Sequence, residues 1–378
     1  MQSVRVLVVV SHLSSEDRDA IESVSLSGTR CGAVDKLYAR EKMARSNFWA
    51  KYWCYRPFDH SSLCRPIGGV KRPGAWRRFS LGELCAATNN FNYDNKLGEG
   101  VIGSVYWGQL ASGDQIAVKR LKVWSAKADR DFAVEIEILG RVRHKNLLSL
   151  LGYCAEGQER LIVYEYMPNF SLYSHLHGHL AVDSTMDWAQ RMNIALGTAE
   201  ALAYLHHSAT PNITHRNLKS SNILLDDKLN PLVADFGLAM LIPEVTAPKA
   251  ISVYSDSKSG KASEIWDVFS FGVLLMELIS GKKRAGQLVS GEKQAIREWA
   301  EPLLQEGQFH NLLDAKLQGN YREDKLARLV QIAALCLQSE AEEGPSMQDV
   351  VEMLQGTQDL DKSHHGKDGL HLEDACHF

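Results

Sequence analysis

The fold of this chain is decided by the stretch Asn212-Ile-Thr-His-Arg-Asn-Leu-Lys-Ser-Ser-Asn-Ile-Leu-Leu225, which is followed by Val233-Ala-Asp-Phe-Gly237. The polar side chains of the first segment stand at a fixed spacing, and they are His215, Arg216, Asn217, Lys219 and Asn222. That spacing is typical of a loop that positions phosphate for transfer, and an Asp-Phe-Gly turn downstream is typical of a metal ligand. Together the two segments predict a site for phosphoryl transfer.

A glycine-rich segment lies upstream, Gly98-Glu-Gly100-Val-Ile-Gly103-Ser-Val105. Glycine lets the backbone approach a phosphate closely, with its amide groups pointing at the anion. A dinucleotide-binding turn has the same spacing, but it needs a helix directly after the glycines and an acidic residue about twenty positions on. Here a strand-like run follows, and the next run, Gln115-Ile-Ala-Val-Lys119, ends in a lysine. The pattern therefore favours a loop that covers nucleotide phosphates.

Lys119 and Glu135 are a candidate ion pair. Lys119 ends an apolar strand, where an unpaired ammonium group would be costly to bury. Glu135 lies on a helix predicted over residues 126–142, beside its inward apolar face. Either residue taken alone is more often a solvated surface charge. Together with the glycine-rich segment, the two predict a pair that positions phosphates.

Three further polar residues are expected to have defined partners. Asn222 and Asp235 supply oxygen atoms of the kind that Mg²⁺ prefers, so they are the candidate metal ligands. Asp267 begins an almost wholly apolar run, so its carboxylate is predicted to be buried and must find hydrogen-bond donors. The backbone amides of His215 and Arg216 are the expected donors.

The length and composition predict one large domain with extensions. The 378 residues are 45% hydrophobic and 23% charged, which is enough to bury a sizeable core. Residues 1–90 carry a balance of +6 within a net charge of −4, and the acidic remainder argues against a nucleic-acid binder. Seven scattered cysteines favour a reducing compartment, and no apolar run is long enough to cross a bilayer. A cytoplasmic location is expected.

The predicted domain boundaries follow changes in composition. Residues 1–78 are expected to be an N-terminal extension, residues 79–356 the main domain, and the polar residues 357–378 a disordered tail. Residues 40–78 are basic and aromatic and include Cys54 and Cys64. They are interpreted either as a peripheral plasma-membrane tether with acylated cysteines or as a solvated linker whose aromatic side chains pack on the domain.

Periodicity predicts a β-rich part followed by a helical part. Strands are expected over residues 97–107, 115–119, 147–151 and 160–166, with a turn at Gly113-Asp114. A capping box, Ser80-Leu-Gly-Glu83, is expected to open a short helix that ends at Asn89-Asn90. Longer helices are expected over residues 126–142, 188–202, 265–279 and 326–337.

These motifs resemble those of the eukaryotic protein kinases, and in particular the plant receptor-like cytoplasmic kinases of the Pto-interacting type. The segments that carry the resemblance are Lys96–Trp107, Ile116–Lys119, Arg143-His-Lys-Asn146, Gly152-Tyr-Cys154, Leu161–Asn169 and Thr214–Phe236. The resemblance implies an α+β fold with a small β-rich N-lobe, about 79–164, and a larger α-helical C-lobe, about 169–356. It also implies ATP and Mg²⁺ as cofactors, Ser/Thr phosphorylation, and protein partners in a signalling pathway.

The resemblance also implies a role for each matching residue. Those expected around ATP are Gly98, Gly100, Gly103, Val105, Ala117, Lys119, Tyr164 as gatekeeper, Glu165, Met167 and Leu224. Asn222 and Asp235 would hold the metal. The catalytic set would be Lys119, Glu135, Lys219 and residue 217, where the family has its catalytic aspartate.

The chain departs from the family pattern at three places. Residue 217 is asparagine, which cannot accept a proton, and loss of a general base typically slows a reaction by about 10²–10⁴-fold. The segment from Asp235 to Asp267 is about eight residues short and lacks the Ala-Pro-Glu motif. Glu343-Gly344-Pro345 replaces the Arg-Pro whose arginine pairs with that motif's glutamate in related kinases.

Three hypotheses follow. The leading one is a nucleotide-binding pseudokinase, or strongly impaired kinase, that acts through partner binding. The alternative is an active Ser/Thr kinase, which the intact Lys119, Glu135, Asn222 and Asp235 favour. The third is a non-functional or mis-spliced kinase remnant.

Overall fold

The structure is a computed structural model that describes residues 76–122, 126–184, 186–242, 257–287, 293–317, 319, 321–338 and 344–357. The chain divides into two units, residues 1–73 and 74–378, and all the described residues belong to the second. The predictions for most of the basic, aromatic segment, with Cys54 and Cys64, and for residues 358–378 therefore lie outside the described residues. So do residues 243–256, in the middle of the shortened segment from Asp235 to Asp267.

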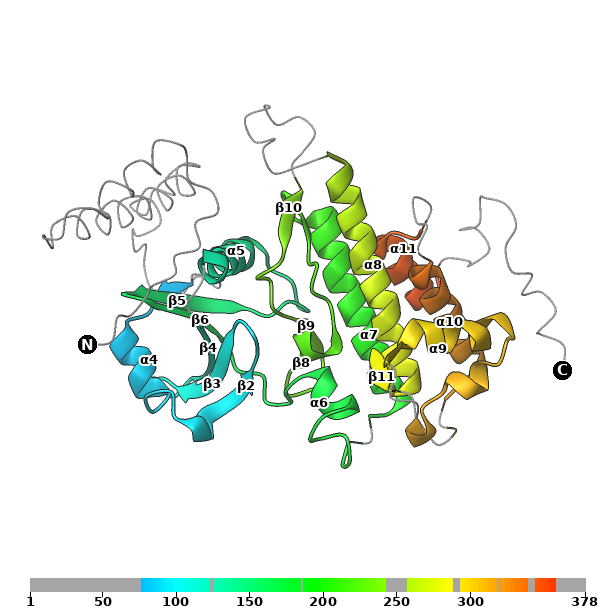
Figure 1. Ribbon diagram of the computed structural model, residues 1–378, viewed down its shortest axis with the longest axis horizontal. Helices are drawn as coiled ribbons and strands as arrows, with labels where there is room; N and C mark the ends of the chain where they lie inside the picture. The colour runs from blue at the N-terminus through cyan, green and yellow to red at the C-terminus, as the bar shows by residue number, and fades with distance from the viewer. Residues whose placement is uncertain are drawn as a thin grey trace, which may run out of the picture. The chain divides into compact units, whose positions relative to one another are not determined.

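A six-stranded sheet forms the first part of the described unit, in the order β1-β5-β6-β4-β3-β2 (Figure 1). Its strands are β1 (Arg77–Arg78), β2 (Lys96–Glu99), β3 (Gly103–Gln109), β4 (Gln115–Leu121), β5 (Leu150–Glu156) and β6 (Glu159–Glu165). The β1 strand pairs parallel with β5, and the other pairs are antiparallel. Gly113 and Gly157 take positive φ values of 91° and 54° in the turns that close two hairpins.

Two helices lie between strands of this sheet along the chain, one after β1 and the other after β4. The α4 helix (Leu81–Ala87) begins where predicted, because the Ser80 side chain accepts a hydrogen bond from the Glu83 amide at 3.1 Å. The Glu83 carboxylate pairs with Arg77 on β1, so the predicted reciprocal half of the capping box is replaced by an ion pair. The α5 helix (Ala126–Arg141) confirms the helix predicted over 126–142 and carries Glu135.

One predicted strand was misplaced. A strand was expected over residues 147–151, but β5 begins at Leu150. The first residues of the run are apolar for another reason: they pack against the short strands of the helical lobe. Leu147 forms an isolated parallel bridge with Val233, and the Leu148 amide donates to the Val233 carbonyl at 3.0 Å. Burial alone does not distinguish such a crossing segment from a sheet strand.

The second part of the described unit is helical. Its helices are α6 (Leu172–Leu176), α7 (Trp188–Ala203), α8 (Ser257–Ser280), α9 (Ile296–Gln305), α10 (Glu323–Leu337) and α11 (Met347–Gln355). Short strand pairs accompany them: β7 (Asn212–Thr214) with β10 (Met240–Ile242), β8 (Ile223–Leu225) with β9 (Pro231–Val233), and β11 (Ala285–Gln287) with β12 (Lys293–Ala295). Single turns of 3₁₀- or π-helix lie at Tyr93–Asn95, Tyr204–Ser208, Ser220–Asn222, Phe309–Leu312 and Ala315–Leu317.

The long helices α7 and α8 lie side by side in the helical lobe (Figure 1). The predicted apolar helix over residues 265–279 is confirmed as the C-terminal part of α8, which begins eight residues earlier. Its side chains from Val268 to Ile279 are mostly buried, and Phe271 is completely so. The molecule thus has the predicted α+β, two-lobed architecture. No helix of the described residues has both the length and the apolar character of a membrane span.

Candidate functional site

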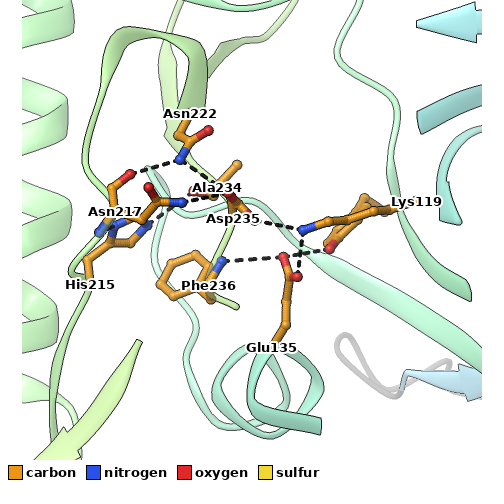
Figure 2. A network of polar contacts seen from close by, with 9 residues as sticks. Lys119, Glu135, His215, Asn217, Asn222, Ala234, Asp235 and Phe236 are labelled. Atoms are coloured by element: carbon orange, nitrogen blue, oxygen red, sulfur yellow. Dashed lines mark hydrogen bonds and ion pairs between the residues drawn. The ribbon is translucent and has the colours of Figure 1, made fainter. Parts of the chain in front are cut away.

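A buried ion-pair cluster joins the two lobes at the predicted site (Figure 2). The Lys119 ammonium on β4 donates to Glu135 Oε2 at 2.8 Å and to Asp235 Oδ1 at 2.7 Å. The side chains are 13%, 2% and 24% exposed, so the contacts are shielded from water. The predicted Lys119–Glu135 contact is therefore formed, and Asp235 is brought to the same lysine.

The cluster keeps its members charged. Burial acts to lower the pKa of Lys119, but the Glu135 and Asp235 carboxylates outweigh it and raise that pKa above its ordinary range. Burial acts to raise the pKa of Asp235, yet the Lys119 cation outweighs it and holds that pKa low. The lysine and Asp235 consequently stay ionised over the physiological pH range.

Tyr164, at the end of β6, has a contact that the sequence did not indicate. Its hydroxyl donates to Glu135 Oε1 at 2.6 Å, and the Phe236 amide donates to the same oxygen at 3.3 Å. Burial raises the pKa of Tyr164 well above its usual value, so the phenol remains a proton donor. A buried tyrosine hydroxyl usually finds a partner, but the sequence does not show that this partner is Glu135.

His215 and Asp267 hold the backbone around Asn217 in place. Asp267 accepts from the His215 and Arg216 amides, both at 2.7 Å, as predicted, and from His206 Nε2 at 2.9 Å, which was not predicted. The His215 ring accepts from the Asn217 amide at its Nδ1 (3.2 Å) and donates from Nε2 to the Ala234 carbonyl (3.1 Å). Burial lowers the pKa of His215, which keeps this ring neutral. Arg216 has a positive φ of 63°, which these contacts support.

Asn217 contacts Asp235 through its side-chain amide (Figure 2). Asn217 Nδ2 donates to Asp235 Oδ2 at 2.7 Å. Asn222 Nδ2 donates to the Asn217 carbonyl at 2.8 Å and, more weakly, to Asp235 Oδ2 at 3.3 Å. Since Lys119 holds Oδ1, both carboxylate oxygens of Asp235 have a donor from this chain.

The remaining predicted residues lie on the elements around this cluster. Val105 lies on β3, Ala117 on β4, Glu165 at the end of β6, Met167 just after β6 and Leu224 on β8. Ala117 and Met167 are buried, whereas the side chain of Glu165 is exposed. The exposed Lys219 lies close enough to Asp235 for its charge to help lower the pKa of that carboxyl. Their role at a nucleotide base remains a prediction.

The glycine-rich hairpin fits a phosphate-covering role. A Cβ placed on Gly98 would meet nothing within 4 Å, and one on Gly100 would meet only the Gly103 carbonyl, at 4.0 Å. These two positions leave open space for close approach of an anion. A Cβ on Gly103 would lie 2.4 Å from the Arg120 carbonyl, so that glycine is required by strand packing.

The oxygen donors also fit Mg²⁺ in kind. Asp235 offers a carboxylate and Asn222 an amide oxygen, and Mg²⁺ is commonly held by one or two protein ligands together with phosphates and water. The described residues contain no group of three or more His, Cys, Asp or Glu side chains arranged for a metal. The metal would thus depend on nucleotide phosphates as well as on this chain.

Comparison with known proteins decides the family. The family model described as protein tyrosine and serine/threonine kinase matches residues 91–354. The chain belongs to this protein kinase family. It is 51% identical to a PTI1-like tyrosine-protein kinase of Arabidopsis thaliana, over 75% of this chain and 81% of that protein. This confirms the resemblance to plant receptor-like kinases.

Two further Arabidopsis thaliana relatives of this kinase are proline-rich receptor-like protein kinases. The identity is 40% to PERK3 and 41% to PERK1, over 80% and 82% of this chain. The matches span 60% of PERK3 and 49% of PERK1, so the chain is similar to only part of those two proteins.

Proposed function

We propose that this member of the protein kinase family is a nucleotide-binding pseudokinase, or strongly impaired kinase, that acts by binding protein partners in a signalling pathway. The observation that carries the proposal is the contact of Asn217 with Asp235 beside a formed Lys119–Glu135 pair. The Lys119–Glu135 pair supports phosphate binding, while the side chain at the position of the base is an amide, which donates a hydrogen bond and cannot take up a proton.

The size of the expected defect follows from general-base catalysis. An aspartate at this position accepts the proton of the substrate hydroxyl in related kinases. Without it, the rate is expected to fall by about 10²–10⁴-fold, which corresponds to roughly 3–5 kcal/mol of activation barrier. The Asn217 amide also donates to Asp235 Oδ2, which fixes its side chain toward that carboxylate.

When bound, ATP would supply the phosphoryl group and Mg²⁺ would neutralise phosphate charge. The residues proposed to hold them are the glycine hairpin with Lys119 for the phosphates and, when a metal is bound, Asp235 with Asn222. In a pseudokinase, the same contacts would make ATP a structural ligand that stabilises the junction of the lobes.

A second candidate is a slow Ser/Thr protein kinase. It is favoured by the 2.8 Å Lys119–Glu135 contact and by the exposed Lys219 beside Asp235, which could stabilise charge in a transferring phosphate. Both candidates predict ATP binding, and only the second predicts turnover.

The test combines binding and transfer on one preparation of the full chain. ATP with Mg²⁺ is expected to raise the melting temperature of the wild-type protein but not of Lys119→Ala, while radiolabelled ATP leaves no label on the protein or on a generic protein substrate. Label above the Lys119→Ala background would establish the slow kinase. Absence of any melting shift would overturn both candidates and favour the non-binding remnant.

A further inference from the structure

The contact between Asn217 and Asp235 has consequences for the metal as well as for the base. In related kinases the aspartate of the Asp-Phe-Gly turn is a metal ligand. In this chain, Asp235 Oδ1 accepts from Lys119 at 2.7 Å, and Oδ2 accepts from Asn217 at 2.7 Å and from Asn222 at 3.3 Å. The carboxylate is therefore satisfied by protein donors alone (Figure 2).

An aspartate at position 217 would create the opposite situation. Its carboxylate oxygen would lie where Asn217 Nδ2 lies, within hydrogen-bond distance of Asp235 Oδ2. Two carboxylates at such a distance repel each other strongly, so they either share a proton or hold a cation between them. Asparagine removes that repulsion and supplies a donor hydrogen, so the charged cluster needs no cation.

The charge of the cluster also indicates a weaker attraction for a cation with asparagine than with aspartate at position 217. In direct contact, one lysine, Lys119, faces two carboxylates, Glu135 and Asp235. Lys219 adds a positive charge nearby. An aspartate at position 217 would make this group more negative by one unit. A divalent cation is attracted by the excess negative charge of its ligands, and in this chain the amide would also have to leave Asp235 Oδ2 before a cation could be bound there.

We propose that the Asn217 side-chain amide takes the place of the divalent cation at Asp235, so that this protein binds ATP as the free anion with little or no requirement for Mg²⁺. The inference rests on the proposed nucleotide binding, which it makes more specific. The phosphates would be held by the open glycine hairpin at Gly98 and Gly100 and by Lys119, with Lys219 exposed nearby.

The first test measures ATP affinity by titration calorimetry in excess EDTA and in excess Mg²⁺. For the wild-type protein the two dissociation constants are expected to agree within about threefold. In Asn217→Asp, binding in EDTA is expected to be about 10–100-fold weaker than in Mg²⁺, because the restored carboxylate pair needs the cation. Asn193→Asp adds the same charge at an exposed position of α7 and is expected to behave like the wild type.

A second test needs no nucleotide. The melting temperature of the wild-type protein is expected to be the same in EDTA and in Mg²⁺. That of Asn217→Asp is expected to be lower in EDTA and partly restored by Mg²⁺ alone. Restoration in the Asn193→Asp control as well would assign the effect to general charge screening and would overturn the inference.

The outcomes separate this inference from the proposed function. Wild-type binding that is lost in EDTA would overturn metal independence while leaving nucleotide binding in place. Failure of the wild-type protein to bind ATP in either buffer would overturn the proposed function and this inference with it. Equal affinities in the wild type and a metal requirement in Asn217→Asp would support both.

Discussion

At the scale of single residues, an amide and a carboxylate of nearly equal size have opposite effects on Asp235. Asn217 donates to Asp235 Oδ2 at 2.7 Å, where an aspartate would repel it. The change of one atom thus removes the proposed proton acceptor and also reduces the negative charge beside Asp235, the proposed metal ligand. The same residue connects the proposed loss of turnover with the proposed independence from Mg²⁺.

Asp267 illustrates how a single buried carboxylate fixes a loop. It is fully buried and accepts from the His215 amide, the Arg216 amide and the His206 ring. Asp267→Asn turns one acceptor oxygen into a donor that faces a donor, so we expect a loss of roughly 2–4 kcal/mol in unfolding free energy by urea titration. Asp324→Asn, which breaks an exposed pair, is the control and is expected to cost less than about 1 kcal/mol. Equal costs would contradict this account of the loop.

The half-buried His177 and the buried His215 predict a loss of stability in acid. Burial, helped by the nearby Lys283 charge, lowers the pKa of His177 to about 4, and burial lowers the pKa of His215. Because an unfolded histidine has a pKa near about 6.5, the unfolded chain binds more protons below that pH, and stability falls as the pH drops from there towards 4. The urea midpoint is expected to fall less between pH 7 and 5 in His177→Gln than in the wild type. An equal fall of the urea midpoint in both proteins would show that His177 does not contribute to the loss of stability in acid.

At the scale of elements, the pairing of β1 with β5 depends on one glycine. A Cβ on Gly152 would lie 1.9 Å from the Arg77 carbonyl, so Gly152→Ala is expected to separate these strands and cost roughly 1–3 kcal/mol. Gly82→Ala, inside α4, is the matched control, because its Cβ would meet nothing within 4 Å. This substitution is expected to raise the unfolding free energy by about 0.5–1 kcal/mol. Chemical denaturation measures both. A neutral Gly152→Ala would contradict the tight approach of β1.

Elements with a strong local signal were predictable from the sequence. The helices α5, α7 and α10 follow their apolar periodicity, and the Ser80 cap follows from side-chain chemistry. The start of β5 was not predictable, because Leu147 and Leu148 are apolar through contact with a strand that lies far along the chain. Local patterns carry no information about such a partner.

The candidate site likewise has features that were predictable from the sequence and features that were not. The Lys119–Glu135 pair and the backbone partners of Asp267 were predictable, because a buried charge must be paired. The contacts of Asn217 and Tyr164 were not, since they depend on how elements that are distant in the sequence meet in space. The departure from the family at residue 217 was visible in the sequence, and only the structure shows what the amide contacts.

At the scale of the whole described unit, one lysine joins the two lobes. Lys119 belongs to the sheet, and its ammonium contacts Asp235 of the helical lobe as well as Glu135 on α5. Lys119→Ala would leave two buried carboxylates without their cation, so we expect a loss of roughly 3–5 kcal/mol in unfolding free energy. Lys119→Arg keeps a cation and is expected to lose less than half of that. If the two variants unfold alike, the cluster does not hold the lobes together.

The central claim, that this kinase-family protein holds ATP without transferring its phosphate, is tested most directly by single-turnover phosphotransfer. Radiolabelled ATP is mixed with excess full-length protein and a generic protein substrate, and label is followed on both, with Lys119→Ala as the background. The account predicts that the wild-type protein accumulates no more label than Lys119→Ala, even where it binds the nucleotide. Wild-type labelling that Lys119→Ala abolishes would contradict the account and make the protein an active enzyme.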